Sequence, residues 1–166
     1  MTDRSSAERR VRLPADRRAR QGTPVLVVGF DDQAASVAAL RTAADLARRL
    51  AADLHVVHCI DVRDYPIDPD TDAELWEDHA RKALEHLHVK VGAALAEHQV
   101  RWTYHAWSGH PVTLLVTVAD EQEALMIVVG THRHRSLARM MRGSVSRGVA
   151  RSAHRPVLLV SDPDDG

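Results

Sequence analysis

The sequence predicts an α/β fold: a single domain with an open sheet of five parallel strands and helices on both faces. Five short runs of apolar residues are spread along the chain, each about as long as one strand. Segments with apolar residues at helical spacing separate these runs. Runs that are apolar throughout are typical of strands buried on both faces. Their alternation with helices indicates parallel strands joined by right-handed crossovers.

The first half of the chain predicts two strands and two helices. The first strand is expected over residues 24–30, and Asp32 is the expected N-cap of a helix over about residues 33–51. The apolar positions of that helix recur at helical spacing and are Val37, Leu40, Ala44 and Ala47. A second strand follows over residues 54–60, and then a loop. Thr71 and Glu74 form a capping box that opens a long helix to about residue 98.

The second half continues the same alternation. A third strand is expected over residues 100–106, and Pro111 suits the first position of a third helix. The fourth strand is expected over residues 125–129. The fifth covers residues 156–160, beginning with Pro156 and ending with Val160, and a fourth helix precedes it.

Composition places the chain among ordinary globular proteins. Its 166 residues suit one domain, and a formal net charge of -1 makes nucleic acid an unlikely partner. Cys59 is the only cysteine, which excludes an internal disulfide and suits a reducing compartment. No apolar run is long enough to cross a membrane and no secretory signal is evident, so we expect a cytoplasmic protein.

The two ends of the chain are predicted to lie outside the folded domain, which is assigned to residues 23–162. Residues 1–22 carry seven arginines against three acids and little apolar content, so they are expected to form a disordered, Arg-rich arm. The arm is interpreted either as a solvated extension or as an electrostatic contact for nucleic acid or an acidic partner. Residues 163–166 form a short acidic tail.

A glycine pattern follows the fourth strand. Gly130 comes directly after the apolar run, where the backbone must turn, and Gly143 with Ser144 opens the fourth helix. A strand, a glycine turn and a helix start can together form a cradle for an anion, because the first N–H groups of a helix have no partner within it.

These residues resemble the nucleotide signature of the universal stress protein family. That signature reads Gly, two residues, Gly, nine residues, Gly, then Ser or Thr. Gly130 matches the first glycine, and Gly143 and Ser144 match the last pair at the family spacing. Arg133 stands at the middle glycine, and Asp32 stands where the family usually has glycine after its first acid. The resemblance covers about residues 24–161.

The resemblance implies the strand order 3-2-1-4-5, which places the first and fourth strands side by side at a topological switch point. It also implies that ATP, with Mg²⁺, or a related adenine nucleotide binds there. Carried over by position, the nucleotide-binding candidates are Gly29, Asp31, Cys59 (through its backbone), Gly130, Thr131, His132, Arg133, Gly143, Ser144, Val145 and Ser146.

The two departures from the signature leave alternatives open. Arg133 can fill the space of the phosphates or donate to them. The Asp32 carboxylate can repel a triphosphate, or turn away from it as an N-cap. One hypothesis is therefore a nucleotide-binding stress-response regulator, and the second is a nucleotide-free dimeric interaction protein. A third, slow ATP hydrolysis, has no positioned base beyond Asp31, and no dedicated catalytic motif is present.

Partners and metals complete the expectations. The resemblance implies a homodimer, commonly formed through the fifth strand, whose apolar edge would be exposed in a monomer. A regulatory protein partner is expected but not identified, and no membrane contact is expected. The eleven histidines lack metal spacing: His55 and His58, for example, should point to opposite faces of one strand.

Overall fold

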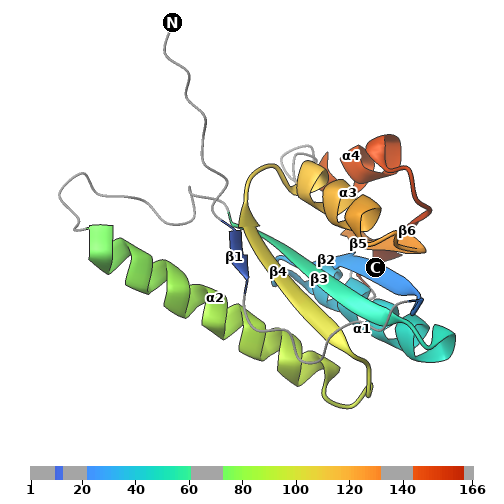
Figure 1. Cartoon of the computed structure of the whole chain (residues 1–166), viewed down its shortest axis with the longest axis horizontal. Helices are drawn as coiled ribbons and strands as arrows, with labels where there is room; N and C mark the ends of the chain where they lie inside the picture. The colour runs from blue at the N-terminus through green and yellow to red at the C-terminus, as the bar shows by residue number, and fades with distance from the viewer. Residues whose placement is uncertain (1–9, 13–21, 61–72, 132–143, 163–166) are drawn as a thin grey trace, which may run out of the picture.

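The computed structural model describes residues 10–12, 22–60, 73–131 and 144–162, and shows one open sheet with helices on both faces (Figure 1). The strands are β1 (Arg10–Arg12), β2 (Val25–Gly29), β3 (Asp53–Ile60), β4 (Trp102–Ser108), β5 (Met126–Thr131) and β6 (Val157–Ser161). The helices are α1 (Ala34–Leu50), α2 (Ala73–Leu95), α3 (Pro111–Glu121) and α4 (Ser144–Ser152).

The strand order confirms the predicted topology. The sheet runs β1-β4-β3-β2-β5-β6, and the five strands from β2 to β6 are mutually parallel in the expected order. Strand β2 therefore lies between β3 and β5. Because β3 follows on one side of β2 and β5 on the other, the carboxyl ends of β2 and β5 form a topological switch point.

Strand β1 was not predicted. Residues 10–12 belong to the arm that was expected to be disordered, yet they form β1, which pairs antiparallel with β4. A strand at the edge of a sheet presents unpaired N–H and C=O groups, so even three residues can add to it without burying a hydrophobic face. The other residues of the arm, and the acidic tail, lie outside the described segments.

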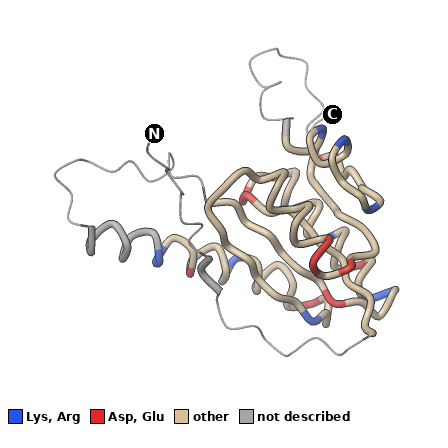
Figure 2. The backbone as a smooth tube through the Cα atoms, turned by 45° about the horizontal axis from the view of Figure 1, so that its top comes forward, with Lys and Arg blue, Asp and Glu red and all other residues tan. Residues whose placement is uncertain are grey.

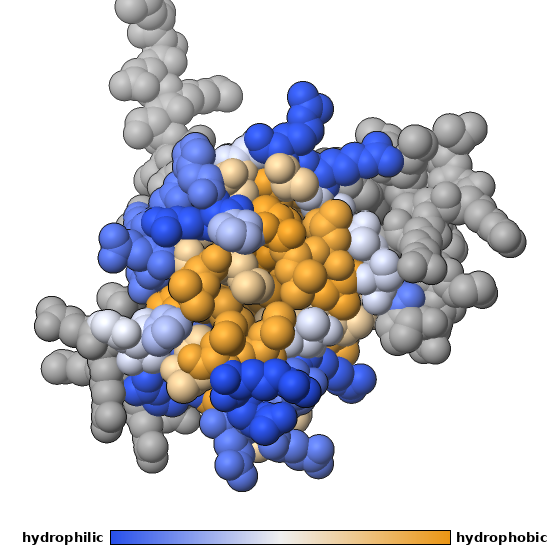
Figure 3. Space-filling model, turned by 90° about the vertical axis from the view of Figure 1, so that its right-hand side faces the viewer, coloured by the Kyte–Doolittle hydropathy of each residue, from blue (hydrophilic) through white to orange (hydrophobic). Residues whose placement is uncertain are grey.

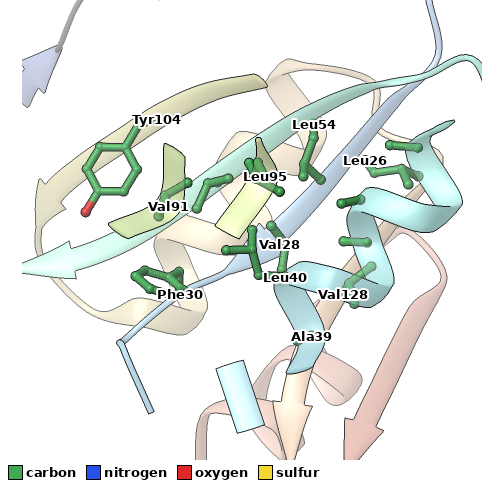
Figure 4. Packing of buried hydrophobic residues seen from close by; sticks show 14 of the residues in the cluster. Leu26, Val28, Phe30, Ala39, Leu40, Leu54, Val91, Leu95, Tyr104 and Val128 are labelled. Carbon is green, nitrogen blue, oxygen red and sulfur yellow. The ribbon is translucent and has the colours of Figure 1, made fainter. Parts of the chain in front are cut away.

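Two hydrophobic cores cover the two faces of the sheet. Alternate residues of the strands point to opposite faces, which divides the apolar side chains into two sets. One set packs under α1 and α2 and includes Leu26, Val28, Leu54, Val91 and Val128, all fully buried (Figure 4). The other packs under α3 and α4 and includes Val27, Leu115, Ile127, Val129 and Val149. The sheet is thus rigidly held between two layers, with its carboxyl edge left open to loops.

The start of α1 corrects one prediction. The N-cap of this helix is Gln33 rather than Asp32, and no side chain caps it. Asp32 instead adopts a left-handed backbone conformation, with φ of 62°. An N-cap residue needs an extended backbone, so the left-handed turn at Asp32 moves the cap one residue along the chain. The expected Thr71 cap of α2 lies outside the described residues.

Candidate functional site

The site is centred on the carboxyl ends of β2 and β5. Val28 pairs with Val128 across these strands, and β2 ends one residue later at Gly29. Strand β5 continues to Gly130 and Thr131, which also pair with β6. Asp31 lies two residues beyond the end of β2, so residues about 100 positions apart in the sequence lie at the same edge of the sheet. The convergence follows from the strand order.

Asp31 is fastened to the first turn of α1. Its carboxylate Oδ1 accepts a hydrogen bond from the Gln33 N–H at 3.1 Å, and its own N–H donates to Ser36 Oγ at 3.2 Å. The Ser36 hydroxyl donates in turn to the Gln33 carbonyl at 2.9 Å. The Asp31 side chain is nevertheless exposed. Its orientation is therefore fixed before any ligand arrives, while one carboxylate oxygen stays accessible.

The loop between β2 and α1 is also held from β3. The Phe30 N–H donates to the Val57 carbonyl at 2.9 Å, and Nδ1 of His58 lies 2.9 Å from the Phe30 carbonyl oxygen. A carbonyl oxygen can only accept, so the His58 Nδ1 carries the proton in this contact. These bonds fix the path of the backbone immediately before Asp31.

Asp32 turns away from the first turn of α1 and pairs with α2. Its Oδ2 lies 2.6 Å from Nζ of Lys90. Aspartate is one of the few residues other than glycine that tolerate a left-handed backbone. The left-handed turn at Asp32 therefore needs no glycine, and Lys90 of α2 neutralises the acid.

Gly130 is required by packing. A Cβ at this position would lie 2.5 Å from the backbone carbon and oxygen of Ala35 and 2.8 Å from the Ser36 nitrogen. Real side chains do not approach that closely, and a helix backbone cannot move aside as a flexible side chain can. The first glycine of the signature thus lets α1 rest directly on β5, which brings the N-terminal end of α1 to the strand ends.

Two further candidates lie on the α3 side of the sheet. Cys59, near the end of β3, donates its Sγ hydrogen to the Gly109 carbonyl at 2.8 Å, in the turn before α3. The Cα of Gly29 faces Leu115 of α3, whose two methyl carbons would be 3.3 and 3.5 Å from an added Cβ. The Cys59 side chain therefore contacts the turn before α3, and the role of its backbone in nucleotide binding stays a prediction.

The remaining candidates belong to α4 and the segment before it. Val145 is half-buried and Ser146 is buried, in the first turn of a helix that begins at Ser144. Close packing fixes α4 against α3, because a Cβ on Gly148 would lie 2.6 Å from a methyl carbon of Val112. His132, Arg133, Gly143 and the side chain of Ser144 lie outside the described residues, so the fit of phosphates beside Arg133 stays a prediction.

Sequence reasoning missed Lys90, His58 and Ser36. Ser36 had a local signal, since a serine three residues after Gln33 can bond back to that turn. Lys90 had none, because 58 positions separate it from Asp32.

Figure 2 shows acidic and basic positions interspersed along the described chain. Within that part of the chain, no three His, Cys, Asp or Glu side chains lie close enough to hold a metal ion, and no helix is long and apolar enough to span a membrane.

Comparisons with known proteins agree with this architecture. Residues 23–161 match the model of the universal stress protein family. A universal stress protein of Methanocaldococcus jannaschii is 28% identical over 143 residues, covering 83% of this chain and 82% of its own length. The crystal structure of a universal stress protein in complex with cAMP aligns with a TM-score of 0.63 at 21% identity, covering 84% of this chain and 98% of that chain.

A universal stress protein from Archaeoglobus fulgidus, solved in complex with dAMP, aligns with a TM-score of 0.55 at 25% identity. The alignment covers 83% of this chain and 97% of that one. The family match spans almost the whole sheet and includes both strand ends that build the site. The chain therefore belongs to the universal stress protein family.

Proposed function

We propose that this protein binds ATP or a related adenine nucleotide at the carboxyl ends of β2 and β5 and acts as a stress-response regulator. The observation that supports the proposal is that β2 and β5 are parallel neighbours, with Asp31 just beyond the end of β2 and Gly130 and Thr131 at the end of β5. Ligands of open α/β sheets bind at such points. The dAMP complex of the Archaeoglobus fulgidus relative supports an adenine nucleotide as the ligand class.

The chemistry of the site suits a nucleotide. The free carboxylate oxygen of Asp31 can accept hydrogen bonds from a base or a ribose hydroxyl. The N-terminal ends of α1 and α4 offer N–H donors and positive partial charge to phosphate oxygens. Arg133, by its position in the signature, would add a guanidinium donor, and Mg²⁺ would enter with ATP as a counter-ion of its phosphates.

The direct test is to identify the ligand and measure its affinity. Mass spectrometry of the ligand released from gently purified protein, with calorimetry of ATP binding, should reveal an adenine nucleotide. Asp31→Ala should raise the Kd by about ten- to a hundredfold, because it removes a charged hydrogen-bond acceptor. Asp45→Ala is the matched control: it removes an exposed carboxylate from the distant half of α1 and should leave the Kd unchanged.

The opposite result would favour a different class of protein. Protein that carries no ligand and gives no heat with ATP would indicate the nucleotide-free interaction module. A turnover assay on the same sample separates binding from slow ATP hydrolysis, since a binding protein releases no phosphate above the background rate. Equal Kd changes in Asp31→Ala and Asp45→Ala would place the nucleotide elsewhere.

We further propose that two copies pair through β6. Figure 3 shows a continuous hydrophobic area on the face that carries this strand, ringed by hydrophilic residues. Leu159 is 47% exposed, and its neighbours Val157, Leu158 and Val160 are half-buried. The outer edge of β6 has unpaired backbone groups in the described chain, and a second copy of the same edge would satisfy them and cover Leu159.

Such a dimer would give a nucleotide-dependent signal a route to a partner. Strand β6 pairs directly with β5, and Thr131 at the site pairs with Ser161 at the end of β6. A change at the β5 end therefore lies one strand from the dimer edge. The proposed location is the cytoplasm, which suits a chain with a single cysteine.

A further inference from the structure

We infer that Lys90 of α2 strengthens the binding of a polyphosphate at the site, by neutralising Asp32 in the loop between β2 and α1. The inference deepens the proposed function and rests on it. It concerns the acid that stands where the family usually has glycine. An unpaired carboxylate at this position would repel the phosphates of a nucleotide, and a paired one would not.

The pair is short and defined. Nζ of Lys90 lies 2.6 Å from Oδ2 of Asp32, within the range of a charge-assisted hydrogen bond. The side chains are 44% and 33% exposed, so water and salt partly screen the attraction between them. The left-handed backbone of Asp32, with φ of 62°, directs the carboxylate to α2, whereas the neighbouring Asp31 carboxylate bonds within its own loop to the Gln33 N–H.

Lys90 is held where it can make this contact. The next residue, Val91, is fully buried in the core between α2 and the sheet. Two residues before Lys90, the ring of His88 lies 5.0 Å from that of Trp102 and 5.5 Å from that of Tyr104, both on β4. The backbone around Lys90 is therefore anchored on both sides. This part of α2 is already held by packing when the ammonium group pairs with Asp32.

Asp32 lies near Gly130, so in the proposed site its charge would act on the phosphates of a nucleotide. Ala35 lies against Gly130, and three Cα–Cα steps lead from Asp32 to Ala35, so the Asp32 backbone is at most about 11 Å from that contact. That separation is about one Debye length at physiological salt. A unit charge there changes the Kd by roughly twofold for each unit of ligand charge before screening.

The ion pair should therefore act on ligands according to their charge. With Lys90 present, the Asp32–Lys90 pair has no net charge. ATP is then repelled no more than it would be by an uncharged residue at position 32. Without Lys90, a bare carboxylate opposes the roughly four negative charges of ATP. Adenosine, which is uncharged, should be indifferent to the change. This dependence on ligand charge distinguishes neutralisation from a purely structural role.

The experiment compares ATP and adenosine binding to a set of variants of the full chain by calorimetry at low salt. Lys90→Met keeps most of the apolar stem and removes the ammonium group. Asp32→Asn removes the carboxylate and keeps a residue that tolerates the left-handed turn. The double variant removes both charges. Arg81→Met is the control, because it removes one cation and one ion pair, with Glu85, from the same helix.

Lys90→Met should weaken ATP by about tenfold and change adenosine by less than about twofold. Asp32→Asn should tighten ATP, and the double variant should return to within about twofold of the wild-type Kd for ATP. Arg81→Met should leave both ligands unchanged. Because the pair is substantially exposed, all variants should melt close to the wild type, so binding is measured on folded protein.

Three results would overturn the inference while leaving nucleotide binding intact. They are an unchanged ATP affinity in Lys90→Met, an equal loss of ATP and adenosine, and a double variant no better than Lys90→Met. The last two would indicate that the pair holds the loop in shape. A wild-type protein that binds neither ligand would remove the proposed function, and this inference with it.

Discussion

At the scale of single residues, two separate physical reasons explain the glycine at position 130. The nucleotide signature places a glycine there, and the anion-cradle argument explains it by backbone approach of a phosphate. The structure gives a second reason, because α1 lies so close that a Cβ would collide with the Ala35 carbonyl. A glycine at this position is thus needed for the fold with or without a ligand, so its presence alone does not demonstrate nucleotide binding.

Gly130→Ala should therefore destabilise the free protein by about 3 kcal/mol or more, since the colliding atoms belong to a helix backbone. Urea unfolding monitored by circular dichroism measures the change. Gly92→Ala is the matched control: its Cβ would meet only the Trp102 ring at 3.5 Å, an ordinary contact. It lies inside α2, where alanine should add about 0.5–1 kcal/mol. Similar effects of the two substitutions would contradict the packing explanation.

At the scale of elements, β3 and β4 carry histidines on both faces of the sheet. His58 bonds to the Phe30 carbonyl beside the site, while His55 lies against His105 of β4, as expected for residues three apart in one strand. The rings of His55 and His105 are stacked, with 3.0 Å between Nδ1 of the first and Nε2 of the second, and both side chains are buried. This polar contact links two strands inside an otherwise apolar layer.

His105→Phe should cost about 1–3 kcal/mol of unfolding free energy, because it takes a hydrogen-bond partner from a buried imidazole nitrogen of His55. The midpoint and slope of urea unfolding report it. His154→Phe is the control, since that side chain is 77% exposed and pairs with Asp120 only at the surface. Its effect should stay within about 0.5 kcal/mol. A loss of the same small size in His105→Phe would mean that the imidazole pair contributes nothing.

At the scale of the whole molecule, the two edges of the sheet differ in length of strand and in exposed apolar surface. Strand β1 covers the outer side of β4, and β6 ends the described sheet on the other side with an exposed Leu159 (Figures 1 and 3). An open apolar edge invites pairing, and a covered one does not. In the proposed dimer the two copies would therefore pair through β6, because residues 10–12 already pair with β4 at the other side of the sheet.

Leu159→Arg should convert the proposed dimer to a monomer. In the dimer, the two arginines on the facing β6 strands would lose their water and lie next to a charge of the same sign. Sedimentation velocity over a range of concentrations measures the dissociation constant, which should rise by about a hundredfold or more. Val89→Arg is the control, since Val89 is 66% exposed on α2, at the opposite side of the sheet (Figure 1). A wild-type protein that sediments as a monomer would remove the β6 proposal.

The sequence by itself determined the five parallel strands, the helices between them and the family. Buried strands appear in the sequence as short apolar runs, and buried helix faces appear as apolar residues at helical spacing. Through the strand order that the family resemblance implies, the sequence also assigned Asp31 and Gly130 to the same carboxyl edge of the sheet.

Only the tertiary structure decided what those residues contact. The pairing of Lys90 with Asp32, the contact of Ala35 with Gly130 and the addition of β1 to β4 each join segments far apart in the chain. Partly exposed ion pairs and edge pairings contribute little free energy and impose no period on the sequence, so no local pattern records them. They become visible only when the sheet has brought its distant ends together.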